Sequence, residues 1–243
     1  MNIEVDTHTH SIASVHAYST IDELARGARR RRLKGFVITE HGPELQGAPH
    51  RYYFGNLKVL PEKMRGVFVF HGAELNIMDT AGHVDLDKTY IERLHFVMAG
   101  LHEQCFESQS AEINTRALIA AIENPLVDGI SHPGNPAFPA DFEAVVKAAV
   151  RAGKTLEIND SSFRVRTGSA TTCREVAALC KKYGAQVTCG SDAHIANDVG
   201  NVKTALAVIR EAGIDKDALV NRTLASFRAF CAKRKAAKAH LYT

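Results

Sequence analysis

The sequence lacks the features of several common protein classes. No uninterrupted apolar run approaches the roughly 20 residues that a membrane-spanning helix needs. The N-terminus carries no basic segment followed by an apolar stretch, so we expect no signal peptide. The five cysteines are odd in number, scattered and never spaced as Cys-x-x-Cys, which argues against a disulfide framework and against a thiolate zinc site. We therefore expect a cytoplasmic protein that does not associate with membranes.

The sequence also has little net charge and no segment with the composition of a flexible linker. The formal net charge of +3 is too small to indicate nucleic-acid binding by itself. The arginine run 29–32 falls at the end of a predicted helix, where cations interact favourably with the helix dipole, and we interpret it as a solvated face. No Pro/Gly-rich hinge or low-complexity segment divides the chain, so residues 1–243 are predicted to form a single domain.

Short apolar runs alternate with longer segments of helical period, which is typical of β–α units around a parallel sheet. The expected strands cover residues 2–6, 34–39, 67–71, 94–99, 126–131, 154–158 and 185–189. The expected helices cover residues 21–33, 115–123, 140–152, 172–183 and 201–212, with basic helical segments near the C-terminus. These units predict an α/β fold with a closed or nearly closed barrel, and a flat doubly wound sheet is the alternative.

Histidine is the abundant residue, with twelve in the chain, and its placement follows the strands. His8 and His10 lie two residues apart where the first strand ends, so both imidazoles point to the same side. The later strands are followed in turn by His41, Glu74, His102, His132, and finally Asp192 with His194, while His16 lies in the loop after the first strand. In a parallel barrel all these positions meet at one rim.

This placement indicates a metal site. A single histidine is ordinarily a buried, hydrogen-bonded residue or a solvated one, but independent accidents would not gather seven histidines and two carboxylates at one rim. Imidazole and carboxylate ligands suit Zn²⁺, and also Mn²⁺ or Fe²⁺. Nine ligands are too many for one ion, so we expect two or three divalent ions with a bridging carboxylate. The other histidines lack this placement and are interpreted as ordinary residues: His50, His71, His83, His95 and His240.

Seven motifs span nearly the whole chain in order. They are Asp6-Thr-His-Thr-His10, Thr39-Glu-His41-Gly, Gly72-Ala-Glu74, Gly100-Leu-His102-Glu, Ser131-His132-Pro-Gly-Asn135, Glu157-Ile-Asn-Asp-Ser-Ser162 and Gly190-Ser-Asp192-Ala-His194. In this set the chain resembles the PHP (polymerase and histidinol phosphatase) family, and most of all its small stand-alone phosphatases of the YcdX type.

The resemblance implies a distorted, TIM-barrel-like (β/α)7 barrel of seven strands with three metals, and it suggests a homotrimer. Carried onto this chain, the first ion would take His8, His10, Glu74 and Asp192. The second would take Glu74, His102 and His132, with Glu74 as the bridge, and the third would take His16, His41 and His194.

The expected charge of the cluster points to a phosphate ester. Three divalent ions outweigh two carboxylates and one hydroxide, and the remaining positive charge favours a compact dianion such as a phosphate monoester. Coordination lowers the pKa of bound water from 15.7 to about 7, so the first site would hold a metal-activated hydroxide as the nucleophile. Arg164 and Arg166 are candidate phosphate contacts, because guanidinium binds phosphate in a bidentate manner, although solvated loop arginines are the alternative.

These observations predict a metal-dependent phosphatase that acts on small phosphomonoesters. A phosphodiesterase or exonuclease acting on nucleic-acid ends would use the same metals, with the basic helix as its only support. A non-catalytic metal-binding module is a second alternative, although it would not need nine intact ligands. An amidohydrolase also begins with His-x-His, but it commonly uses a bridging lysine, and no lysine ends an expected strand.

Overall fold

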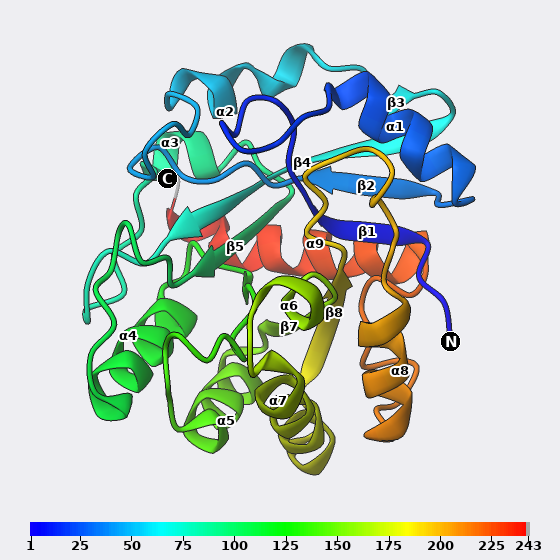
Figure 1. The fold of residues 1–243 in the computed structure, drawn as a ribbon. Helices are drawn as coiled ribbons and strands as arrows, with labels where there is room; N and C mark the ends of the chain where they lie inside the picture. Colours follow the sequence, from blue (N-terminus) through cyan, green and yellow to red (C-terminus); the bar gives the residue numbers. More distant parts are fainter. Residues whose placement is uncertain (242–243) are drawn as a thin grey trace.

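Seven parallel strands form a nearly closed barrel in the computed structural model, which describes residues 1–241 (Figure 1). In barrel order the strands are β1 (Val5–Thr9), β2 (Gly35–Ile38), β4 (Val67–Asn76), β5 (Phe96–Gly100), β6 (Gly129–Ile130), β7 (Thr155–Asn159) and β8 (Gln186–Gly190). A parallel bridge joins Thr9, the last residue of β1, to Ala193, which follows β8. The expected α/β barrel is thus confirmed, and the flat sheet is wrong.

Five long helices lie outside the barrel, each between consecutive strands or after the last (Figure 1). They are α1 (Ile21–Arg30), α4 (Ala111–Glu123), α5 (Phe142–Ala152), α7 (Ser169–Tyr183) and α8 (Lys203–Glu211). The capping box of Thr20 and Glu23 begins α1 as expected. Ser110 caps α4, so this helix begins four residues before the expected start at residue 115.

The C-terminal helix α9 (Leu224–Lys238) crosses the barrel at the end where the strands begin (Figure 1). Its Phe227 and Phe230 pack in one apolar cluster with Val5, Phe70 and Phe96. The Phe227 ring lies edge-on to Phe70, with centroids 5.1 Å apart. Because α9 fills this end of the barrel, the opposite end, where the strands finish, is the one left for a site.

Short elements fill the remaining connections. They are β3 (Lys63–Met64), α2 (Tyr52–Asn56), η1 (Leu57–Val59), α3 (Lys88–Ile91), α6 (Ser162–Val165) and η2 (Ala239–Leu241). Among the described residues, no helix is long and apolar enough to cross a membrane. All five cysteines are free, as their spacing predicts.

The expected boundary of the third strand is wrong. The strand was expected to end at residue 71, but β4 continues to Asn76, so Glu74 lies inside the strand and not after it. The first half of β4 pairs with β2 and the second half with β5. Glu74 and Asn76 are polar residues of the kind that usually marks a loop. The predicted strand therefore ended where the apolar residues ended, although the real strand continues through both residues.

Candidate active site

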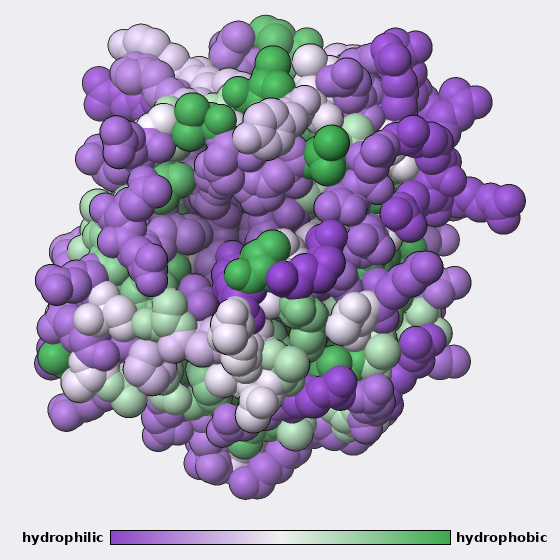
Figure 2. Space-filling view, viewed as in Figure 1, coloured by the Kyte–Doolittle hydropathy of each residue, from purple (hydrophilic) through white to green (hydrophobic). Residues whose placement is uncertain are grey.

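The predicted ligands gather at the end of the barrel where the strands finish. A cavity of about 480 Å³ is lined there by His16, His41, Glu74, His102, His132, Asp192 and His194. His8 and His10 are fully buried against the same cluster. Figure 2 shows a hydrophilic hollow near the middle of this face. The structure therefore brings together all nine side chains that the sequence selects, and the five other histidines do not line the cavity.

Glu74 is the centre of the cluster. Its Oε2 lies 3.2 Å from His8 Nε2 and 3.1 Å from His41 Nδ1. Its Oε1 lies 2.7 Å from His132 Nε2 and 3.4 Å from His102 Nε2. His10 Nε2 also lies 3.5 Å from Oε2, so Oε2 faces three imidazoles and Oε1 faces two others.

His8 of β1 and His10, just after that strand, lie close to Asp192. His8 Nε2 and His10 Nε2 lie 3.1 Å apart, and Asp192 Oδ1 lies 3.5 Å from each of them. The three donor atoms thus lie within 3.5 Å of one another.

Besides the contacts of Glu74 and the set of His8, His10 and Asp192, a third group of ligands consists of imidazole rings packed together at the mouth of the cavity. The ring centroids of His16 lie 5.1 Å from His41 and 4.6 Å from His194. His10 is nearer still, at 4.4 Å and 4.5 Å from the same two rings. His16 is the exposed member of the group, and His10 reaches both the first and the third groups.

The donor atoms fit divalent cations. Buried polar atoms in native proteins are nearly always hydrogen-bonded, but Glu74 Oε2, His102 Nε2 and His194 Nε2 have no hydrogen-bond partner in the described structure. Three triads hold their ligand atoms within 4.8 Å of one another: His8 with His10 and Glu74, His41 with Glu74 and His102, and His10 with His41 and His194. Oxygen and imidazole nitrogen donors without thiolate suit zinc, manganese or iron.

Electrostatics keeps most of these groups in the state that a metal requires. Burial raises the pKa of Glu74, but the surrounding imidazoles, His8 first, hold it well below its usual range. Burial, together with the Arg166 guanidinium, lowers the pKa of His132 to about 4. His8 is the exception, because burial lowers its pKa but Glu157 and Glu74 raise it well above the usual value. Metal ligands must be ionised carboxylates and neutral imidazoles, and Glu74 and His132 meet this condition.

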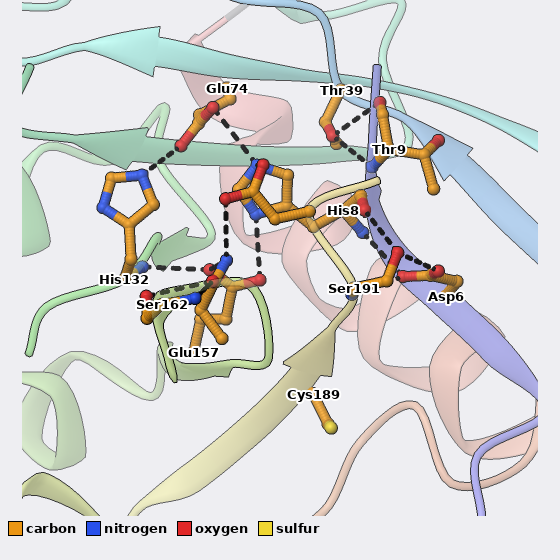
Figure 3. A network of polar contacts seen from close by, with 12 residues as sticks. Asp6, His8, Thr9, Thr39, Glu74, His132, Glu157, Ser162, Cys189 and Ser191 are labelled. Atoms are coloured by element: carbon orange, nitrogen blue, oxygen red, sulfur yellow. Dashed lines mark hydrogen bonds and ion pairs between the residues drawn. The ribbon is translucent and has the colours of Figure 1, made fainter. Parts of the chain in front are cut away.

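A second layer of polar groups orients the imidazoles (Figure 3). Glu157 Oε1 lies 2.9 Å from His8 Nδ1, while its Oε2 accepts the backbone N–H of His132 at 2.9 Å. Asn76 Oδ1 lies 2.6 Å from His102 Nδ1. Such partners fix the ring orientation of metal-binding histidines. The sequence contained Glu157 within a motif but did not reveal its contact, and it gave no sign of the role of Asn76 except a polar residue in a buried strand.

The local backbone is shaped around the cluster. His132 and Asp192 have φ angles of 30° and 55°, in the left-handed region that non-glycine residues rarely adopt. Such strain persists where the surroundings impose it, and it concentrates at functional sites. Gly190 is required for a related reason, because a Cβ atom there would lie 2.3 Å from Glu157 Oε1 and 2.6 Å from the Cβ atom of His8.

The two candidate phosphate-binding arginines lie in different places. Arg166 lines the cavity, its Nη2 lies 3.5 Å from Asp192 Oδ2, and its Nη1 donates to Ser162 Oγ at 2.8 Å. Arg164 does not line the cavity and pairs with Asp198 at 3.1 Å. The charge balance expected from the sequence counted only two carboxylates, but Glu157 is a third buried carboxylate at the cluster.

The chain resembles known proteins over nearly its whole length. Residues 170–224 match the family model described as PHP-associated. A probable phosphatase of Acetivibrio thermocellus is 44% identical over 97% of this chain and 98% of the relative. A probable phosphatase of Thermoanaerobacter sp. (strain X514) is 48% identical over 97% of each chain.

Solved structures of other proteins share the fold. The histidinol phosphate phosphatase of Lactococcus lactis, solved with zinc, L-histidinol and phosphate, has a TM-score of 0.63 at 16% identity, over 88% of this chain and 95% of that one. The fold and the cluster define an α/β-barrel metal-dependent hydrolase. Its close relatives identify the chain as a member of the PHP family of phosphatases, which are phosphoric ester hydrolases.

Proposed function

We propose that this protein hydrolyses small phosphomonoesters at a site that holds three divalent ions, zinc first, with manganese or iron as alternatives. The observation that carries the proposal is the convergence of nine imidazole and carboxylate side chains on Glu74 and the cavity above it. The curated relatives, which are named probable phosphatases, support the same activity.

We assign the ligands in three groups. His8, His10, Glu74 and Asp192 would hold the first ion, and the short distances among their donor atoms support this set. Glu74, His102 and His132 would hold the second, and His41 is an additional neighbour of Glu74. His16, His41 and His194 would hold the third, with His10 within reach.

When bound, the ions supply Lewis acidity that activates water and neutralises phosphoryl charge. The protein's own groups position the reactants. Arg166 faces the cavity and would bind a phosphoryl oxygen, while its contacts with Ser162 and Asp192 hold the guanidinium in place. Glu157 fixes the His8 ring through Nδ1, which leaves Nε2 directed at the cluster.

The cavity suits a small ester. Its volume of about 480 Å³ is within the usual range of small-molecule sites, about 300–1,000 Å³. Leu45, Leu101 and Phe138 add apolar surface beside the polar cluster, where the organic part of an ester would lie. The same fold holds zinc and phosphate in the Lactococcus lactis enzyme. The cavity lining contains no lysine, which disfavours an amidohydrolase of the lysine-bridged kind.

The test is a comparison of substrates on metal-loaded protein. We expect aryl phosphates and other small phosphomonoesters to show a kcat/KM at least about 100-fold above that of bis-aryl diesters or single-stranded DNA, equivalent to about 2.7 kcal/mol. Chelation should abolish the activity and added divalent metal should restore it. Processive digestion of DNA would support the exonuclease instead, and no turnover of any phosphoester would support the non-catalytic module. The homotrimer and the cytoplasmic location stay predictions.

A further inference from the structure

A second hollow lies beside the active site, between α1 and the segment that follows His194. Its volume is about 850 Å³, and its walls include Tyr18, Arg26, Arg29, Arg30, Arg65 and Ile195. Arg26, Arg29 and Arg30 share one face of α1, since residues three and four apart in a helix are neighbours. Part of the basic run that the sequence assigned to a solvated face thus lines a concave surface.

The positive charge of this hollow is only partly neutralised. Asp22 pairs with both Arg26 and Arg65, at 2.5 Å and 2.6 Å. Glu23 is occupied at the helix cap, where its Oε2 accepts the backbone N–H of Thr20 at 2.7 Å. Arg29 has no ion pair among residues 1–241, and Arg30 donates only to the neutral side chain of Asn197, at 2.9 Å. Two guanidinium groups therefore face the hollow without a carboxylate partner.

An exposed ring stands next to these arginines. The Tyr18 residue is 77% exposed, and Ile195 on the neighbouring segment is 43% exposed. Aromatic rings of this kind give a platform on which a flat ring stacks, and guanidinium groups bind phosphate in a bidentate manner. Together they would recognise a ligand that carries both groups.

The segments that form the walls of the hollow are closely packed and also carry two of the proposed metal ligands. A Cβ atom on Gly27 would lie 2.1 Å from the carbonyl oxygen of Ala196, so α1 and this segment are in close contact. The backbone N–H of Tyr18 donates to the carbonyl of His194 at 2.8 Å, and the N–H of Ala196 donates to Ser19 Oγ at 2.9 Å. The two segments that form the wall are those that carry His16 and His194.

From these observations we propose that the hollow binds a phosphorylated ligand with a flat ring, of the nucleoside diphosphate class, with its phosphates on Arg29 and Arg30 and its ring on Tyr18. The site is distinct from the proposed metal cluster, and it does not depend on the metal count or on the substrate preference. A small ligand is favoured over nucleic acid because only two guanidinium groups are uncompensated and the whole chain carries a charge of only +3.

The chain has no tryptophan, so Tyr18→Trp introduces a single fluorescent reporter at an exposed position. The probes are ADP, inorganic pyrophosphate and a single-stranded DNA oligonucleotide, added to the metal-loaded protein and read immediately after mixing. We expect saturable quenching by ADP, and we expect pyrophosphate to displace ADP while quenching less because it has no ring.

The arginines are tested in the same reporter background. Arg29→Ala with Arg30→Ala should weaken ADP binding at least tenfold, while the matched pair Arg116→Ala with Arg151→Ala, on exposed faces of α4 and α5, should leave it unchanged. Circular dichroism verifies that each variant is folded. Equal ADP affinity in both pairs, or no saturable quenching, would overturn the proposal. Tighter binding of the oligonucleotide than of ADP would also overturn it, in favour of a nucleic-acid surface.

Discussion

At the scale of single residues, the carboxylate of Glu74 is the group that most of the other proposed ligands contact. Glu74 is fully buried and lies within 3.5 Å of five imidazoles, those of His8, His10, His41, His102 and His132. Among the described residues, single ring nitrogens of its neighbours His10, His41 and His102 have no hydrogen-bond partner, whereas His16 lies at the exposed mouth. The two residues should therefore differ sharply in their importance for metal binding.

We predict that Glu74→Gln loses more metal than His16→Ala. Gln preserves the shape but removes the charge and one donor oxygen, so two proposed ions lose a ligand, whereas His16→Ala affects one. Dialysed proteins should retain at most one ion per chain for Glu74→Gln and about two for His16→Ala, as measured by plasma mass spectrometry. Equal losses would show that Glu74 is not a bridge.

Glu157 allows a test of the second layer. We expect Glu157→Gln to weaken zinc binding about 10–100-fold, as removal of such partners of metal-bound histidines usually does, because the His8 ring loses a charged partner at 2.9 Å. Competition with a coloured chelator measures the affinity. Glu175, an exposed carboxylate on α7 that does not line the cavity, provides the control, Glu175→Gln. Unchanged zinc affinity in Glu157→Gln would contradict the orienting role.

The nine proposed ligands could be predicted from the sequence, but their partners could not. Each ligand lies near the carboxyl end of a strand or in the loop that follows it, so residue type and strand order were sufficient. The contact of Glu157 with His8 depends on how β7, β8 and β1 sit beside one another, and no spacing in the sequence encodes that arrangement. The role of Asn76 could not be predicted for the same reason, because its partner His102 lies in the loop after a different strand, β5.

At the scale of elements, the polar residues of the site make the ends of the strands hard to predict from the sequence. The expected first strand covered residues 2–6, whereas β1 is Val5–Thr9 and includes polar residues that are fully buried. β4 likewise continues through Glu74 to Asn76. An apolar pattern marks strands only where the core is apolar, so predictions fail where a strand delivers polar side chains to a functional site. The helices α1 and α5 carry no proposed metal ligand, and they begin close to the positions that the sequence predicts.

The attachment of α9 creates a buried cluster of charge. Arg234 and Lys238 on α9 both contact Asp128, at 3.1 Å and 2.7 Å, and Lys154 lies near them, hydrogen-bonded to the carbonyl of Asn124. Burial first, and then the charge of Arg234, lowers the pKa of Lys154 from 10.5 to about 7. One carboxylate thus lies among three buried cations.

This cluster predicts a pH dependence of stability. Between pH 7 and about 10 the unfolded chain binds the Lys154 proton more tightly than the folded protein, so the free energy of unfolding should rise with pH in this window. Lys154→Met should reduce that rise, while the exposed Lys58→Met should not. Urea unfolding at pH 7, 8 and 9 measures both slopes. Identical slopes in wild type and Lys154→Met would show that Lys154 is not destabilised by burial.

At the scale of the whole molecule, the barrel turns scattered residues into one site. Parallel strands bring all their carboxyl ends to the same rim, and α9 fills the other end with aromatic side chains. The topology could be predicted because β–α alternation and the positions of the ligands agreed. The short elements between β2 and β5 could not, because their few residues carry no period.

The most direct test of the account is the number of divalent ions bound to each chain. The structure gathers nine imidazole and carboxylate side chains around one cavity, and no single ion coordinates nine such ligands. Purified and dialysed protein, reconstituted with zinc, manganese or iron where necessary, should contain two to three ions per chain by plasma mass spectrometry, with three as the full complement. One ion or none after reconstitution would contradict the proposed metal cluster and the phosphatase mechanism that rests on it.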